Sequence, residues 1–364
     1  MNTKVESFLP RELEITLSNN CFLKCKYCFF NYFQSNKTIT ANFEKICEGI
    51  EQYIKKAKKE NVKVERIGFV DYPDPLPYYE ILKKLIIYIR KKHTDLKIEV
   101  QTNGILLDEN KLKFLFDNNV LVVLKFDGTK QSTDFLKKYR NISNSIFDKV
   151  IENLKKLPNE YIKKINVAPT FTPDTIHNLV SDINFLSDIG FCEIQLKNMG
   201  IPMIWSKNNL EKLEIELKKL KLFYLKTLFK NIKNKKHQLV IHFSSLFNED
   251  IPKTFNEFLL ESNGSFYTAY YPFYAKDSIN FKVGYHKTGI NLNKIKKTKE
   301  KIMKYLNSKI SNSSDIIYIP NPALLYTTIK LLKVPNSLSL IESTIKFGKI
   351  VNKVLYDINK LKKI

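Results

Sequence analysis

The sequence predicts an α/β protein: an open, partial barrel of six βα units, followed by a smaller mixed α+β region. Strand-like and helix-like segments alternate through the first two hundred residues, which is the pattern of a parallel sheet covered by helices. After about residue 205 the alternation stops and a long lysine-rich amphipathic stretch begins. We therefore expect a barrel over residues 1–204 and a C-terminal substrate or partner region over residues 205–364.

Each expected element has a local reason in the sequence. The strands are short apolar runs rich in β-branched residues, and the helices carry apolar residues at helical spacing. Turn residues separate them, as in the DYPDPLP stretch after the second strand. We expect strands at 13–17, 64–70, 96–102, 120–126, 163–171 and 192–198, and helices at 43–59, 79–92, 109–118, 146–156 and 175–189. Further on we expect a helix at 209–236, a strand in QLVIHFS, a β-meander over 265–285, and helices at 322–332 and 337–360.

The bulk composition is that of a soluble globular protein. The chain has 364 residues, of which 43% are hydrophobic and 27% charged. It has no apolar run of about 18 residues and no apolar signal core near its start, so we expect no transmembrane segment and a cytoplasmic protein. The formal net charge of +23 suits nucleic acid, an anionic membrane or an acidic peptide, but a lysine-rich background composition is the favoured explanation.

Three cysteines lie within eight residues, directly after the first expected strand. Cys21, Cys25 and Cys28 follow the spacing C-x3-C-x2-C in the string CFLKCKYC. Three thiolates can hold three corners of a [4Fe–4S] cluster, which normally takes four cysteines, and leave one iron open. A structural zinc site needs four ligands, and the next cysteine and the first histidine are as far away as Cys47 and His93. Three unrelated buried thiols are the remaining alternative.

This string resembles the signature of the radical S-adenosylmethionine (SAM) enzymes, including the aromatic residue, Tyr27, before the third cysteine. The resemblance implies a partial TIM-like (βα)6 barrel and a [4Fe–4S] cluster held by Cys21, Cys25 and Cys28. It further implies that SAM binds the open iron beside Tyr27. An electron from a donor such as flavodoxin or ferredoxin then cleaves SAM to methionine and a 5′-deoxyadenosyl radical, which abstracts hydrogen from the substrate.

After the second strand the family usually carries a Gly-Gly-Glu-Pro motif that binds the amino group of SAM. The matching residues here are Tyr72, Pro73, Asp74 and Pro75. Asp74 can supply the carboxylate. Tyr72 and Pro73 replace both glycines, which removes a backbone N–H and the close approach that glycine permits.

The ends of the third and fourth strands carry further candidates. Thr102 and Asn103, in a Thr-Asn-Gly string, and Lys125 and Asp127, in Lys-Phe-Asp-Gly, resemble segments of the branch with molybdenum-cofactor enzymes and peptide-modifying maturases. The resemblance implies cofactor contacts for Thr102 and Asn103. Lys125 stands where that branch has serine, and it could meet the carboxylate of SAM or the substrate. We expect catalytic roles for Lys125 and Asp127, although Asp127 with its glycine also fits a plain turn.

The C-terminal region lacks the cysteines that many relatives use for auxiliary clusters in SPASM or Twitch domains, since no cysteine follows Cys192. It could be a cysteine-less remnant of such a domain. The resemblance favours a peptide or small protein as substrate, with an acidic leader held by the basic C-terminal region. Two alternatives stay open: radical modification of a nucleotide, RNA or small metabolite, and a non-catalytic Fe–S scaffold.

Overall fold

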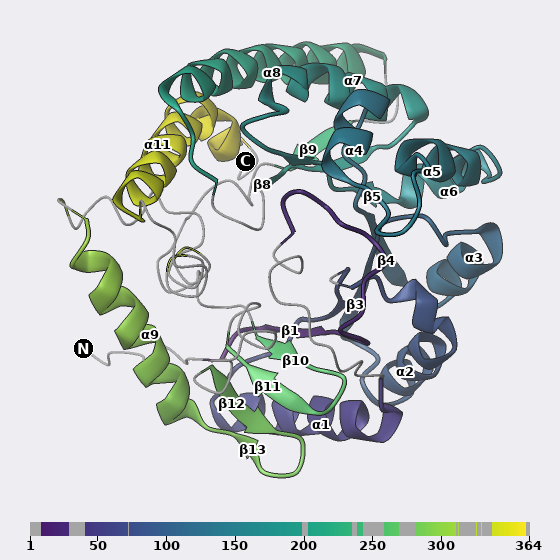
Figure 1. Ribbon diagram of the computed structural model, residues 1–364. Coiled ribbons are helices and arrows are strands. Elements are labelled where there is room, and N and C mark those ends of the chain that lie inside the picture. The colour runs from purple at the N-terminus through teal and green to yellow at the C-terminus, as the bar shows by residue number, and fades with distance from the viewer. Residues whose placement is uncertain are drawn as a thin grey trace.

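The computed structural model describes residues 9–28, 41–71, 73–198, 203–234, 239–242, 258–268, 281–310 and 337–361, together with residues 312, 325 and 329. In this part of the chain, helices surround an arc of strands (Figure 1). The helix expected at 322–332, apart from residues 325 and 329, and the middle of the meander expected at 265–285 lie outside the described residues.

Eight parallel strands form the central sheet, in the order β10-β1-β2-β3-β4-β5-β7-β9. The prediction of six parallel strands in chain order, β1 to β7 with β6 aside, is confirmed, and β9 and β10 extend the sheet at its two ends. The strands are β1 (Glu12–Ile15), β2 (Arg66–Phe69), β3 (Lys97–Thr102), β4 (Val120–Leu124), β5 (Asn166–Val167), β7 (Glu193–Gln195), β9 (Val240–His242) and β10 (Leu259–Leu260).

Helices between consecutive strands cover the outer side of this sheet, and several begin at side chains that cap them. The side chains of Asn42, Asp108 and Ser145 each accept a hydrogen bond from the backbone N–H three residues on, which satisfies a donor that the first turn leaves open. The helices are α1 (Phe43–Lys59), α2 (Tyr79–Lys92), α3 (Glu109–Asp117), α4 (Lys130–Leu136), α5 (Ile146–Leu154), α6 (Asn159–Lys164) and α7 (Leu179–Ile189), with 3-10 turns η2 (Leu76–Tyr78) and η3 (Ile176–Asn178).

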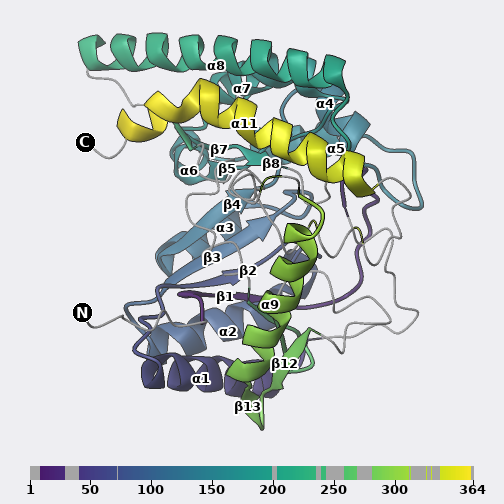
Figure 2. The ribbon, with the colours of Figure 1, turned by 90° about the vertical axis from the view of Figure 1, so that its left-hand side faces the viewer.

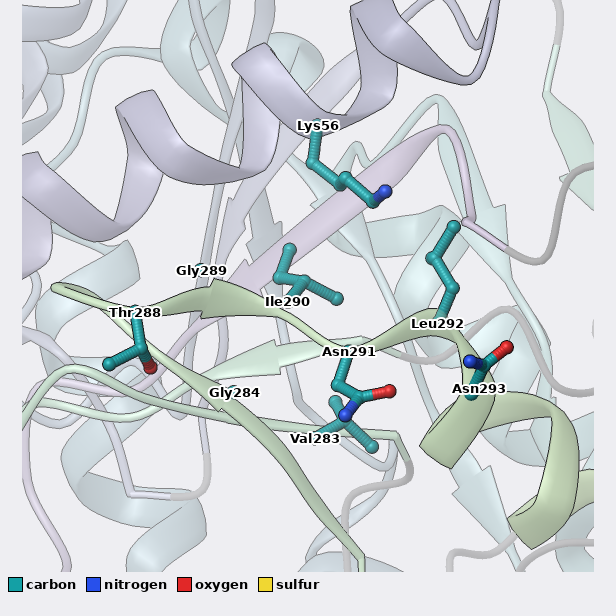
Figure 3. Close-up of a pocket in the computed structure, with 9 residues that line it drawn as sticks. All are labelled: Lys56, Val283, Gly284, Thr288, Gly289, Ile290, Asn291, Leu292 and Asn293. Carbon is teal, nitrogen blue, oxygen red and sulfur yellow. The ribbon is translucent and has the colours of Figure 1, made fainter.

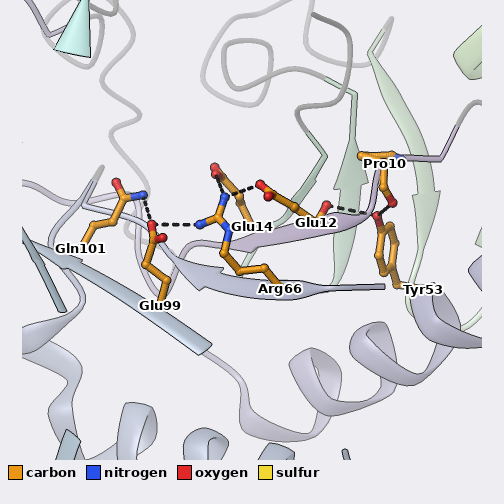
Figure 4. A network of polar contacts seen from close by, with 7 residues as sticks. All are labelled: Pro10, Glu12, Glu14, Tyr53, Arg66, Glu99 and Gln101. Carbon is orange, nitrogen blue, oxygen red and sulfur yellow. Dashed lines mark hydrogen bonds and ion pairs between the residues drawn. The ribbon is translucent and has the colours of Figure 1, made fainter. Parts of the chain in front are cut away.

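The two faces of the sheet differ in chemistry because side chains alternate along a strand. In β1, Leu13 and Ile15 are fully buried in the outer core, whereas Glu12 and Glu14 point to the other face. Arg66 of β2 binds both of these glutamates (Figure 4). The inside of the barrel is therefore polar and charged.

The fifth and sixth expected strands each divide into two short strands. Pro169, which has no N–H to donate, interrupts the fifth after Ala168. The chain resumes as β6 (Thr170–Phe171), which pairs with β8 (Lys197–Asn198) in a separate two-stranded sheet. This break brings the start of β6 next to the turn that follows β4, where the N–H of Thr170 donates to Asp127 (2.9 Å).

The C-terminal region shares the sheet and the core of the barrel. The strands β11 (Ser265–Tyr267), β12 (Lys282–Tyr285) and β13 (Gly289–Ile290) continue from β10 as an antiparallel edge. The long helices α8 (Lys207–Asn234) and α11 (Ser337–Leu361) run side by side across one end, and α9 (Leu292–Asn307) lies along the flank (Figure 2). Among the described residues no helix is long and apolar enough to cross a membrane.

Candidate functional site

The cysteine loop follows β1 and lies at the C-terminal ends of the parallel strands, where side chains from several strands can meet. Residues 136–140, which begin at the last residue of α4, hold this loop by backbone hydrogen bonds, and we call them the docking segment. The N–H of Lys24 donates to the carbonyl of Lys138 (2.7 Å), and that of Lys26 donates to Leu136 (2.8 Å). The loop is thus paired like a strand with a segment more than 100 residues later in the chain.

Arg140 ends this docking segment and is a residue that the sequence analysis missed. Its N–H donates to the carbonyl of Phe22 (3.0 Å), and its side-chain Nε donates to the carbonyl of Cys21 (2.8 Å). Burial raises the pKa of the Cys21 thiol to about 11, and the Arg140 guanidinium acts against that rise. The signal that could have indicated Arg140 is the rarity of arginine in so lysine-rich a chain.

Cys21, Cys25 and Cys28 are half-buried on this one loop, and none forms a disulfide. Burial raises the pKa of Cys25 well above its ordinary value, and the neighbouring thiols Cys28 and Cys21 raise it further. The loop thus offers three sulfur ligands, close enough that Cys21 and Cys28 raise the pKa of Cys25. Such a set suits a thiolate-ligated cluster, because a bound metal keeps its cysteine ligands deprotonated. Among the described residues, no three or more His, Cys, Asp and Glu side chains are arranged as a preformed metal site.

Asp74, Thr102 and Asn103 come together as the sequence predicts. One carboxylate oxygen of Asp74 accepts from the N–H of Leu76 (2.8 Å), and the other accepts from the Thr102 hydroxyl (2.8 Å) and the Asn103 N–H (2.7 Å). Burial raises the pKa of Asp74 to about 6 in spite of these three bonds. Asp74 thus ties the loop after β2 to the loop after β3.

Asp127 and Tyr27 also come together, around a residue that the sequence analysis did not name. Asp127 is fully buried and forms an ion pair with Lys137 Nζ (3.1 Å). It accepts hydrogen bonds from the N–H of Thr170 (2.9 Å) and, at 3.5 Å, from the Tyr27 hydroxyl. Lys137 also donates to the carbonyl of Lys125. Asp127 therefore joins the cysteine loop, the end of α4 and the start of β6.

Lys125 joins this network through its backbone. Its N–H donates to the carbonyl of Thr102 (2.7 Å), and its half-buried side chain acts electrostatically on Lys197. Lys125 connects the group of Asp74 to that of Asp127, because its N–H donates to Thr102 and its carbonyl accepts from Lys137. The predicted residues thus form two clusters that the backbone of Lys125 joins.

A second carboxylate, Asp71, lies close to the thiols and was also missed. It is half-buried at the end of β2, and its charge raises the pKa values of Cys21, Tyr27 and Asp74. Its sequence signal was weak because a single aspartate before a proline-rich turn is common in loops.

The surface also has an open groove of about 610 Å³ between α1 and the β12–β13 hairpin (Figure 3). None of its lining residues belongs to the cysteine loop or to the clusters just described. We therefore place the functional site at the strand ends and not in this groove. The groove is lined by Lys56, Val283, Gly284, Thr288, Gly289, Ile290, Asn291, Leu292 and Asn293.

Comparison with known proteins identifies a family for this part of the chain. The model of the family "Radical SAM superfamily" matches residues 15–186, a span that begins in β1 and includes the cysteine loop and both clusters. A cysteine-type anaerobic sulfatase-maturating enzyme of Clostridium novyi is 28% identical over 287 residues, 74% of each chain. The radical SAM cyclopropyl synthase TigE of Paramaledivibacter caminithermalis is 28% identical over 197 residues, which are 50% of this chain and 40% of TigE.

Solved structures show the same fold. The structure of anSMEcpe with bound AdoMet superposes with a TM-score of 0.67 at 21% identity, over 97% of this chain and 95% of the other. The structure of anSMEcpe with bound AdoMet and the Cp18Cys peptide has a TM-score of 0.65 at 20% identity, over 96% and 99%. The prediction of a partial TIM-like barrel is thereby confirmed. With the cysteine loop at the strand ends and the family match across it, this chain is an enzyme with a radical SAM domain over residues 15–186, and it is similar to the sulfatase maturases.

Proposed function

We propose that this enzyme uses one [4Fe–4S] cluster and SAM to abstract hydrogen from a peptide or small protein. The observation that carries the proposal is the placement of three cysteines on one docked loop, beside two polar clusters from neighbouring strand ends. When bound, the cluster and SAM supply the reductive cleavage that yields the 5′-deoxyadenosyl radical. Cys21, Cys25 and Cys28 are the proposed cluster ligands.

The protein's own residues bind and orient in this proposal. A carboxylate has about four acceptor sites, and three of those on Asp74 are used, so one is left for the amino group of SAM. Thr102 and Asn103 fix that carboxylate and present the loop after β3 to the cofactor. Tyr27 lies beside the adenine through its backbone, while its hydroxyl is held by Asp127.

Lys125 and Asp127 are the residues proposed to act nearest the substrate. Asp127 is proposed to position the residues around it and not to contact the substrate itself, because its carboxylate is already bound by Lys137, Thr170 and Tyr27. Lys125 is the candidate for direct contact, since its ammonium group has no hydrogen bond or ion pair in the described part of the structure. A low-potential donor such as flavodoxin or ferredoxin would supply the electron.

The peptide class of substrate is supported by the relatives, which include sulfatase-maturating enzymes and a structure with a bound peptide. The lysine-rich helix α8 gives less support to a nucleic acid. Lys218 pairs with Glu214 (2.8 Å) and Lys219 pairs with Glu216 (2.7 Å). These ion pairs reduce the positive charge that would attract phosphate.

The test is anaerobic reconstitution followed by iron counting, EPR with and without SAM, and an assay for 5′-deoxyadenosine under dithionite. We expect about four irons per chain, an EPR signal that changes on SAM addition, and 5′-deoxyadenosine. The Cys21→Ala, Cys25→Ala and Cys28→Ala variants should lose all three.

Cys47→Ala and Cys192→Ala are the matched controls, because these thiols lie outside the loop, in α1 and just before β7. Both controls should retain iron and 5′-deoxyadenosine formation. Zinc in place of iron, or a cluster that does not respond to SAM, would contradict the proposal and leave a scaffold.

A further inference from the structure

The cysteine loop and the docking segment together form a short antiparallel ribbon. Leu23 and Tyr139 form an antiparallel bridge, and the N–H of Lys24 donates to the carbonyl of Lys138 (2.7 Å). Lys24 and Lys138 therefore lie opposite each other. Because side chains alternate along each strand of such a ribbon, its two sides carry different residues.

The inner side of the ribbon belongs to the candidate site. Cys25 lies opposite Lys137 in the same register. Burial raises the pKa of Cys25, and the charge of Lys137 acts against that rise. Lys137 is almost inaccessible and pairs with Asp127 (3.1 Å). The inner side thus holds a cysteine thiol and the buried ion pair.

The outer side of the ribbon carries lysines that face solvent. Lys24, Lys26 and Lys138 are exposed, and in the described part of the chain none of the three forms an ion pair. The ammonium group of Lys26 lies 3.2 Å from the ring centroid of Phe135, and 38% of Phe135 is exposed. An exposed aromatic ring and three lysines thus lie on the solvent side of the ribbon that carries the thiols.

The neighbouring sequence has few acids to neutralise these lysines. Residues 21–28 contain no aspartate or glutamate, and Asp134 is the single acid of residues 129–145. Its carboxylate is turned to the start of α5, where it accepts from the Ser145 hydroxyl (2.6 Å) and the N–H of Phe147 (3.0 Å). The outer side of the ribbon therefore keeps an excess of positive charge.

We propose that the outer side of this ribbon is the docking surface for a small, acidic electron-transfer protein. The proposal rests on the proposed function, which assigns the cluster to the cysteines of the same ribbon and requires a low-potential donor. Electron transfer needs a short path, and Cys25 lies between Lys24 and Lys26 in the chain. The donor is oxidised by one electron, the cluster is reduced by one electron, and no bond forms or breaks.

The composition of this surface fits such a donor. Redox partners form weak complexes with small contact areas, for which one exposed ring and a few charges suffice. Opposite charges on the two proteins raise the rate at which they meet. The surface charge here comes from lysine, whose flexible ammonium group suits scattered carboxylates better than it suits bidentate phosphate.

The experiment measures binding of an acidic flavodoxin and an acidic ferredoxin to the anaerobically reconstituted protein by isothermal titration. We expect at least one of them to bind at low ionic strength and to bind more weakly as salt is added. The triple variant Lys24→Glu, Lys26→Glu, Lys138→Glu should weaken this binding by about tenfold or more and reduce its salt dependence.

A second triple variant, Lys59→Glu, Lys91→Glu, Lys163→Glu, is the matched control, because it changes the net charge by the same amount. These lysines are exposed in the last turns of α1, α2 and α6. Each of these helices ends before a strand begins, so the three lysines lie at the end of the barrel opposite the cysteine loop. The control should bind the donor as the wild type does.

Reduction kinetics give a second readout. The rate at which the donor reduces the cluster is divided by the rate with photoreduced deazaflavin, a neutral reductant that needs no docking surface. This ratio should fall about tenfold in the ribbon variant and stay unchanged in the control. Lys138→Glu alone, which lies outside the cysteine loop, should lower donor binding and the ratio in the same direction if the triple variant fails to take up iron.

The proposal is overturned if neither donor binds the wild-type protein at low ionic strength. It is also overturned if the ribbon variant and Lys138→Glu bind the donor and accept its electron as the wild type does. Absence of 5′-deoxyadenosine under photoreduction, with donor binding still dependent on the ribbon lysines, would count against the proposed function alone.

Discussion

At the scale of single residues, the few arginines of this chain stand out. Each arginine inside the fold lies where its planar guanidinium group can form hydrogen bonds or ion pairs. The chain has 60 lysines and arginines, of which four are arginines. Arg66 bridges Glu12 and Glu99 on the inner face of the sheet. Arg90 donates to two carbonyls of the α3–β4 turn and to that of Leu96 before β3, and Arg140 holds the cysteine loop. Lysine, as a flexible point charge, could not replace the forked contacts.

The buried ion pair of Asp127 and Lys137 leads to the first prediction. Lys137→Met leaves the Asp127 carboxylate without its cation in a site where both side chains are almost inaccessible. We expect a loss of about 3–5 kcal/mol in the free energy of unfolding, because one unpaired buried charge remains. Urea unfolding followed by circular dichroism measures it. Lys113→Met, from an exposed pair, should change stability by less than about 0.5 kcal/mol.

The buried carboxylate of Asp182 leads to a prediction of how the stability of the fold depends on pH. Its carboxylate accepts from the N–H of Thr129 (2.9 Å) and the hydroxyl of Ser132 (2.7 Å), but burial still raises its pKa from 3.8 to about 6. At pH 5 the folded state therefore holds a proton that the unfolded state has released. Stability from this group is greatest near pH 4 and falls as pH rises through 6, by roughly 3 kcal/mol.

Asp182→Asn should remove this part of the fall, because an amide does not titrate. Urea midpoints between pH 4 and pH 7 measure the slope for both proteins. Asp148→Asn, at an exposed carboxylate paired with Lys130, should keep the wild-type slope over this range. Equal slopes for Asp182→Asn and wild type would contradict the assignment.

Elements differ in how far the sequence alone predicts them. The helices expected at 43–59 and 79–92 match α1 and α2 residue for residue, since local caps and apolar spacing determine them. The strand expected at 163–171 was too long, because Pro169 divides it into β5 and β6. The two-residue strand β10 was not predicted, because only its pairing with β1 defines it.

In the candidate site, too, some residues are predicted by the sequence around them, and others reach the site only through the fold. The cysteines and the Asp74 group follow from short strings and were predicted. Lys137 and Arg140 were not, because their contacts reach the site from elsewhere in the fold. Nothing in their immediate sequence distinguishes these basic residues from the many others.

The docking of the cysteine loop leads to a prediction at this scale. Arg140→Met removes the side-chain hydrogen bond to Cys21 while it keeps the chain length and most of the apolar contact. We expect the amides of Lys24 and Lys26, which donate across to the docking segment, to exchange about tenfold faster by hydrogen–deuterium exchange. Arg11→Met, from an exposed pair with Glu65, is the control and should leave both amides unchanged.

At the scale of the whole molecule, the C-terminal region contributes side chains to the buried core as well as to the surface. The single tryptophan, Trp205, packs against Phe347 of α11, with ring centroids 5.0 Å apart, and against Phe171 at 6.4 Å. Val70 of the barrel shares a second apolar cluster with residues of α9 and α11. A sheet and core shared in this way predict that the molecule unfolds as one unit.

Phe347→Ala tests this prediction. The ring is almost fully buried, so its loss should cost about 3–5 kcal/mol and lower the urea midpoint. Tryptophan fluorescence at the junction and circular dichroism of the whole fold should report the same transition in both proteins. Two separate transitions would show that the region after residue 204 folds on its own. Leu222→Ala, at an exposed position on α8, should leave the midpoint unchanged.

The hydrogen bonds between the cysteine loop and its docking segment also affect how the protein matures in the cell. Many small metal domains fold only when their ion arrives. Here the loop's backbone is already paired with residues 136–140 by contacts that involve no sulfur. Under the proposed function, the polypeptide could therefore be completed and stored before iron and sulfide are delivered. Shortage of iron would then leave a pool of folded, inactive protein that is ready for loading.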